Sequence, residues 1–181
     1  MHDVAAGVLV CPATPGAPWP VLVRDLLRAL GKQRVIRAPR ATVWHTWTDS
    51  SHPERWWVPA PTVVRVDRLD VRPGGAFVTR VSDDGVEFMP HIDASFLVVD
   101  EFERLVFTNA IDSQWRPASP DPVAMVAEII LGDHSEGTDY RLVVRHGDPA
   151  ARARHEQVGF FDGWGSVTEQ LAALVESEAT R

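Results

Sequence analysis

The 181-residue sequence predicts an α+β fold in which a long C-terminal helix covers one face of an antiparallel sheet. Across residues 62–146 apolar and polar residues mostly alternate without a helical interruption, and consecutive strands of this kind form antiparallel sheets. Further along, apolar residues recur at intervals of four, three, four and three positions, at Phe160, Trp164, Val167, Leu171 and Leu174. This spacing makes one apolar face of a helix. Because such a sheet must bury one face, we expect the helix to cover it.

One strand and two short helices are predicted before the sheet region. Residues 33–37 have the composition of a short strand. Pro39 suits the first turn of a helix, where its missing N–H costs nothing, and this helix extends to about Thr48. Asp49 then provides a cap for a second short helix that ends at residues 56–57.

Six runs of β-forming residues follow, at positions 64–69, 76–81, 87–99, 105–111, 123–131 and 140–146. The turn sequences PGG at 73–75 and DDG at 83–85 separate the first three runs. The closing helix starts near Asp148, an acidic N-cap, with Pro149 at its first position. We expect it to continue as one long helix through the aromatic segment at 159–164.

Residues 1–32 differ from the rest of the chain. Five residues between positions 12 and 20 are proline or glycine, which indicates a loop. Residues 21–30 have the spacing of a short amphipathic helix, with Gly31 as its stop signal. The sequence therefore predicts an N-terminal extension at 1–32 and one domain at 33–178.

The composition argues against several classes of protein. A net charge of −7 disfavours nucleic-acid binding, which needs a basic surface for phosphates. No apolar run approaches the roughly 20 residues that cross a bilayer, so membrane insertion is not expected. The single cysteine, Cys11, forms no internal disulfide and fits a reducing compartment, so we predict a cytoplasmic location. The histidines are scattered without a His-x-x-x-His pair, and we expect neither a metal site nor a cofactor.

Four segments carry a resemblance to a known family: VIRAPRATVW at 35–44, WWVP at 56–59, VRPGGAF at 71–77 and HEQVGFFDGW at 155–164. Together they resemble the START-like, Bet v 1-like (SRPBCC) superfamily. Within it they are most similar to the group named after the activator of Hsp90 ATPase homologue 1. The resemblance covers roughly residues 33–177. It implies a helix-grip fold, in which a curved antiparallel sheet of about six or seven strands wraps around the long C-terminal helix, with two short helices after the first strand.

The resemblance also implies a function. Members of the superfamily often hold an apolar cavity between the sheet and the closing helix, and they bind lipids, polyketides, hormones or other small hydrophobic molecules. We therefore expect this chain to bind a small hydrophobic molecule there. Strand parity and the family geometry select eight pocket residues: Trp47, Trp56, Phe77, Phe107, Trp115, Met125, Phe160 and Trp164.

Two other functions stay open. Some members are cyclases or hydrolases, and here His91, Glu87 and Asp112 are the candidate acid/base residues. The even spacing of Glu87 and His91 puts both on one strand face, as a buried pair or as a solvent-facing polar edge, and we favour the edge. We therefore favour a binding protein over an enzyme. One eukaryotic branch binds a chaperone, so a chaperone partner stays open, as does a homodimer.

Overall fold

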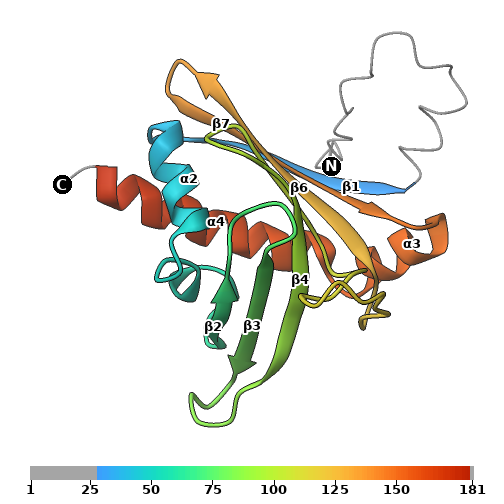
Figure 1. Ribbon diagram of the computed structural model, residues 1–181. Helices are drawn as coiled ribbons and strands as arrows, with labels where there is room; N and C mark the ends of the chain where they lie inside the picture. Colours follow the sequence, from blue (N-terminus) through green and yellow to red (C-terminus); the bar gives the residue numbers. More distant parts are fainter. Residues whose placement is uncertain (1–27, 180–181) are drawn as a thin grey trace, which may run out of the picture.

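The computed structural model describes residues 28–179, which fold around one seven-stranded sheet (Figure 1). Its strands are β1 (Ala29–Ile36), β2 (Val63–Leu69), β3 (Ala76–Ser82), β4 (Met89–Asp100), β5 (Arg104–Thr108), β6 (Met125–His134) and β7 (Gly137–His146). They lie in the order β1-β7-β6-β5-β4-β3-β2, and each neighbouring pair is antiparallel. The predicted α+β class is confirmed.

The helices of the described chain are α2 (Arg40–Thr48), a 3-10 turn η1 (Pro53–Arg55), α3 (Pro149–Gln157) and α4 (Phe160–Ala179). The helix predicted after Pro39 is present and ends at Thr48. The second predicted helix is only the turn η1, because the amides of Trp56 and Trp57 both donate to the Pro53 carbonyl and the chain then leaves the helical path.

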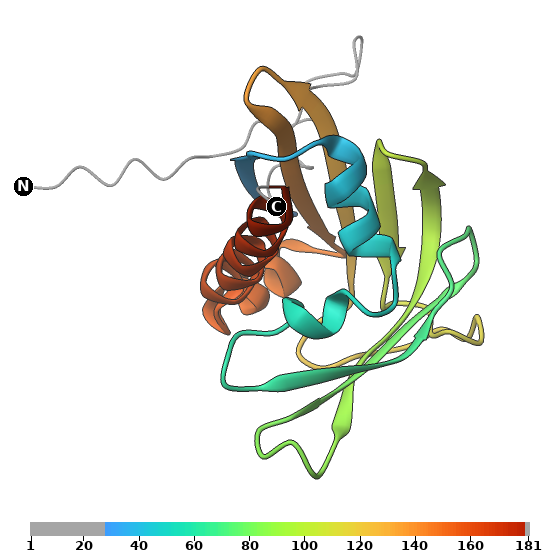
Figure 2. The same cartoon turned by 90° about the vertical axis from the view of Figure 1, so that its left-hand side faces the viewer.

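The sheet curves around α4, and Figure 2 shows the strands arranged about one side of that helix. Register shifts in β2–β3, β3–β4 and β4–β5 mark bulges, which bend strands and increase their twist. Of the predicted apolar face of α4, Phe160, Val167 and Leu171 are buried, whereas Trp164 and Leu174 are half-buried. Val175, which was not predicted, is buried as well. Burial of each such side chain contributes on the order of 1.5–3 kcal/mol. The predicted helix-grip architecture is therefore confirmed.

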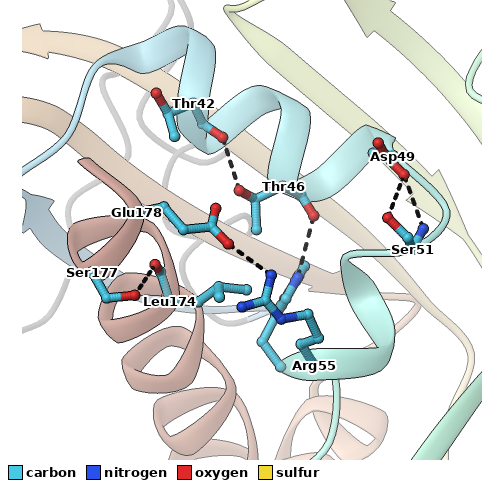
Figure 3. A network of polar contacts seen from close by, with 9 residues as sticks. Thr42, Thr46, Asp49, Ser51, Arg55, Leu174, Ser177 and Glu178 are labelled. Atoms are coloured by element: carbon cyan, nitrogen blue, oxygen red, sulfur yellow. Dashed lines mark hydrogen bonds and ion pairs between the residues drawn. The ribbon is translucent and has the colours of Figure 1, made fainter. Parts of the chain in front are cut away.

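Polar contacts link η1 to the C-terminal part of α4, and the residue after η1 to α2 (Figure 3). Arg55 of η1 forms an ion pair with Glu178 of α4 at 2.7 Å. The buried indole of Trp56 donates to the backbone carbonyl of Thr46 at 3.2 Å. Because Trp56 is fully enclosed, this bond satisfies a donor that burial would otherwise leave unpaired.

The N-terminal boundary of the sheet differs from the prediction. Ala29 and Leu30 belong to β1 and not to a helix, and Gly31 pairs with Val143 of β7 and does not stop a helix. Although these residues have helical spacing, they pair with β7. This pairing satisfies the hydrogen-bonding groups of their backbone and buries Leu30. Residues 29–32 are thus part of the sheet. The rest of the predicted extension, residues 1–27, lies outside the described residues, so the division of the chain otherwise stays a prediction.

The closing helix is interrupted, which the sequence did not predict. It consists of α3 and α4, separated by Val158 and Gly159. Asp148 caps α3 as expected, since its carboxylate accepts from the Ala151 amide at 2.8 Å. Gly159 has a φ of +99°, a conformation that a right-handed helix does not contain and that glycine adopts without a Cβ penalty.

We predict that Gly137→Ala lowers the free energy of unfolding by at least about 2 kcal/mol. Gly137 has a φ of +143°, and a Cβ there would lie 2.2 Å from the carbonyl oxygen of Ile36. Urea denaturation measures the loss. Gly147→Ala is the matched control, because no atom lies within 4 Å of a Cβ at Gly147. Equal stability of both variants would contradict the close packing of the β6–β7 turn on β1.

Candidate functional site

A pocket of about 320 Å³ opens where α3 gives way to α4. Its walls come from the loop after η1, from β4, from the segment between β5 and β6, and from the two C-terminal helices. The lining residues are Trp57, Val58, Pro59, His91, Ile92, Asn109, Asp121, Pro122, Val123, Met125, His155, Val158, Gly159, Phe160, Gly163, Trp164 and Val167. The size lies near the lower end of small-molecule sites, about 300–1,000 Å³.

Aromatic rings form much of the pocket wall. The rings of Trp57 and Trp164 meet edge to face, with centroids 5.5 Å apart. The ring of Phe160 packs against the rings of Trp164 and His155, with centroid distances of 6.4 Å and 5.1 Å, respectively. The indole nitrogen of Trp57 is buried and has no hydrogen-bond partner among residues 28–179. Aromatic rings therefore dominate the wall, while the indole donor of Trp57 is itself buried and not exposed to the pocket.

Asn109 fixes the backbone beside the pocket. Its side-chain NH₂ donates to the Val123 carbonyl at 3.1 Å, and its Oδ1 accepts from the Met125 amide at 2.8 Å. These bonds hold the start of β6 against the end of β5. The amide therefore serves as a structural clamp that positions the apolar side chains of Val123 and Met125 at the wall.

Two histidines form a hydrogen-bonded chain that reaches the pocket. Nδ1 of His146, on β7, lies 2.9 Å from the backbone carbonyl oxygen of Arg28. Nε2 of His146 lies 2.8 Å from Nδ1 of His155, on α3. His155 lines the pocket, whereas His146 is buried behind it. The pair therefore joins α3 to β7 at one wall of the pocket.

Burial keeps this pair uncharged at neutral pH. Desolvation, with a smaller contribution from His146, lowers the pKa of His155 to about 4. Desolvation also lowers the pKa of His146, and the charge of nearby Arg152 lowers it further. The hydrogen bond to the Arg28 carbonyl and the charge of Asp148 raise it. A carbonyl only accepts, so Nδ1 of His146 carries the hydrogen. In a neutral pair His155 must then donate from Nδ1, which leaves its Nε2 as an acceptor.

The three candidate acid/base residues do not meet. His91 lines the pocket mouth, where its Nδ1 lies 2.9 Å from Thr79 Oγ1. Partial burial lowers the pKa of the His91 ring, although much of the residue is exposed. Glu87 is exposed and precedes β4, which begins at Met89, so strand parity does not extend to it. The Asp112 carboxylate accepts from the Gln114 and Arg116 amides and caps a turn away from the pocket.

The structure divides the eight predicted pocket residues into three groups. Met125, Phe160 and Trp164 line the pocket. Trp47, Trp56, Phe77 and Phe107 are buried in the aromatic core and are absent from the pocket wall. Trp115 is 68% exposed, and its indole donates to the Gly74 carbonyl at 2.8 Å. Strand parity identifies the inward face of a strand, but it does not show how far along that face the packed core extends.

Sequence reasoning missed most of the wall, including three residues that carry polar groups: Trp57, Asn109 and His155. Trp57 was not among the eight predicted pocket residues, but it both packs against Trp47 and lines the pocket. Asn109 follows a strand and carries no motif that distinguishes it. His155 opens the HEQVGFFDGW segment, one turn before the aromatic residues, and that position is a signal that could have singled it out.

Within residues 28–179, no group of three His, Cys, Asp or Glu side chains is arranged to hold a metal ion. Across the same residues, no helix has the length and apolar character needed to cross a bilayer.

Residues 37–176 match the family model described as activator of Hsp90 ATPase homolog 1-like protein. The chain belongs to this family. The resemblance drawn from the four sequence segments is thereby confirmed. No curated protein matches the chain.

Solved structures of bacterial proteins share the fold. A protein from Nitrosomonas europaea has 35% sequence identity and a TM-score of 0.77, over 85% of this chain and 97% of its own. A protein from Chromobacterium violaceum has 25% identity and a TM-score of 0.63, over 82% and 97%. An activator of Hsp90 ATPase homologue 1-like protein from Aeromonas hydrophila shares 18% identity and a TM-score of 0.61, over 84% and 95%.

We predict that this family member loses stability as the pH falls from about 6.5 towards 4. The folded state lowers the pKa of His146 and His155 below the ordinary value of 6.5. In that window the unfolded chain takes up protons that the native chain does not, so unfolding becomes more favourable. Urea denaturation at pH 7 and pH 5 measures the change in the free energy of unfolding.

The variant His155→Phe should show a smaller loss between pH 7 and pH 5, because it removes one of these groups. His134→Phe, at an exposed position at the end of β6, should lose as much stability as the unchanged chain. A pH dependence that is the same in all three chains would show that the histidine pair does not cause it.

Proposed function

We propose that the protein binds a small, mainly hydrophobic molecule in the pocket between β4, the β5–β6 segment and α4. The observation that carries this proposal is the wall itself, where most of the lining side chains are apolar, Trp57, Phe160, Trp164 and Val167 among them. Sites for small molecules are concave and mostly apolar, with a few placed polar groups that set orientation. Members of the superfamily often bind their ligands between the sheet and the closing helix, which supports the same proposal.

Size limits the ligand. A pocket of about 320 Å³ lies near the lower end of small-molecule sites, which suits a compound of one or two rings. Removal of apolar ligand surface from water contributes about 25 cal/mol per Å², so burial of such a compound provides most of its affinity.

The enzymatic alternative receives no support from the geometry. Of the three candidate acid/base residues, only His91 reaches the pocket, and its ring bonds with Thr79 and not with a carboxylate. The chaperone partner, the homodimer and the cytoplasmic location stay predictions, since no observation on this chain tests them.

We predict that Gly163→Leu weakens binding of the neutral fluorescent probe N-phenyl-1-naphthylamine at least tenfold. Gly163 lines the pocket, and no atom lies within 4 Å of a Cβ built there, so a leucine side chain would enter the ligand space. Fluorescence titration measures the affinity. The variant should fold, because leucine is favoured over glycine in a helix by roughly 0.5–1 kcal/mol.

Ala173→Leu is the matched control, since it adds the same side chain to the same helix at an exposed position outside the pocket. This control should bind the probe as the unchanged chain does. A stable Gly163→Leu variant with unaltered affinity would place the probe elsewhere and contradict the proposal. Mass spectrometry of an organic extract of the purified protein then identifies the natural ligand.

A further inference from the structure

We infer that the pocket selects an uncharged ligand bearing a hydroxyl donor, phenolic or alcoholic, and that Nε2 of His155 accepts its hydrogen bond. This inference rests on the proposed function and names the chemical class of its ligand. Among the side-chain acceptors of the wall, His155 combines a half-buried position with a nitrogen lone pair that no other described residue uses.

The backbone fixes the direction of the hydrogen bonds. The Arg28 carbonyl accepts from His146, so the other nitrogen of His146 is the acceptor for Nδ1–H of His155. Nε2 of His155 is then left with a lone pair and has no hydrogen-bond partner among residues 28–179. The ring cannot easily rotate away, because Phe160 packs edge to face against it at 5.1 Å.

The other polar groups of the wall do not compete for this role. The carbonyl oxygen and the NH₂ group of the Asn109 side chain both bond to neighbouring backbone. His91 and Asp121 are exposed at the mouth, where water competes for their hydrogen bonds. A ligand donor enclosed by the aromatic wall therefore finds its acceptor at His155.

Charge decides between a neutral and an anionic ligand. None of the residues that line the pocket is lysine or arginine, and Asp121 adds negative charge at the mouth. A carboxylate or phosphate would meet a lone pair at His155 and no cation on the wall, so it would lose its hydration without compensation. A neutral hydroxyl makes one hydrogen bond and leaves the apolar remainder to the aromatic rings.

The same nitrogen is poorly suited to general base catalysis. A pKa of about 4 for His155 lies well below neutral pH, whereas an efficient general base has a pKa near the working pH. A weakly basic lone pair still accepts a hydrogen bond. Weak basicity therefore favours recognition of the hydroxyl over removal of its proton.

The experiment compares 2-naphthol with its methyl ether, 2-methoxynaphthalene, as competitors that displace N-phenyl-1-naphthylamine. The two compounds share an apolar ring system, but only the naphthol donates a hydrogen bond. We expect the naphthol to bind about fivefold more tightly, the value of a typical net hydrogen bond. In His155→Phe this ratio should fall to about one, whereas His134→Phe, at an exposed strand end, should keep it.

The outcomes are distinct. The inference is overturned if the two compounds displace the probe equally, or if the affinity ratio of naphthol to its ether is unchanged in His155→Phe. In either case, binding of the probe itself leaves the proposed function intact. A ratio lost on His91→Phe and kept on His155→Phe assigns the acceptor to the other histidine and also overturns it. Failure of the probe to bind at all counts against the proposed function itself.

A second measurement needs no variant. Long-range ¹H–¹⁵N spectra of the unchanged protein should show Nδ1 protonated and Nε2 unprotonated in both histidines of the pair. Addition of 2-naphthol should shift the Nε2 signal of His155, and 2-methoxynaphthalene should shift it much less. A protonated Nε2 in the free protein would show the reverse hydrogen-bond direction and overturn the inference.

Discussion

The structure depends on burial of the apolar face of α4 against the concave side of the sheet. Leu171 and Val175 are fully enclosed there, and the same cluster contains Ile36 from β1 and Phe107 from β5. Strands that lie far apart in the sequence thus share one partner. Because the sheet has a single long helix to cover this face within the described residues, its curvature, its bulges and the position of α2 all serve the same contact.

The pocket follows from where that contact ends. From its C-terminal end back to Val167, α4 packs closely against the core. Nearer its N-terminal end, at Gly159, the chain leaves the helical path, and α3 instead contacts β7. If the helix were continuous, Val158 and the residues before it would also lie along the sheet. Because the helix is interrupted, the aromatic N-terminal end of α4 is not fully covered by other side chains. Phe160 and Trp164 consequently have one side in the core cluster and one side at the pocket.

The alternation of strands and the spacing on α4 were enough to predict the fold, since both patterns follow from burial on one face. The interruption at Gly159 was not predicted, because a glycine within an amphipathic pattern can be either tolerated or a stop. The pocket was predicted in part. Phe160 and Trp164 follow from helical spacing, but Trp115 was misplaced because its loop turns it outward onto Gly74. His155 gains its importance only from His146, which pairing of β7 with β1 brings into place.

The two walls of the pocket are held by different forces. α4 is anchored mainly by apolar area, which carries little directional information, together with polar contacts such as the Arg55–Glu178 ion pair and the bonds of Gln170 to the Trp56 and Val58 carbonyls. α3 has no buried residue, so its place depends on directional contacts: the Asp148 cap, the bond of His155 to His146, and Arg154 near the Pro122 carbonyl. The wall that offers the polar acceptor is therefore also the wall positioned by hydrogen bonds. That arrangement fixes the direction of the acceptor more closely than apolar packing would, and direction is what a single hydrogen bond to a small ligand requires.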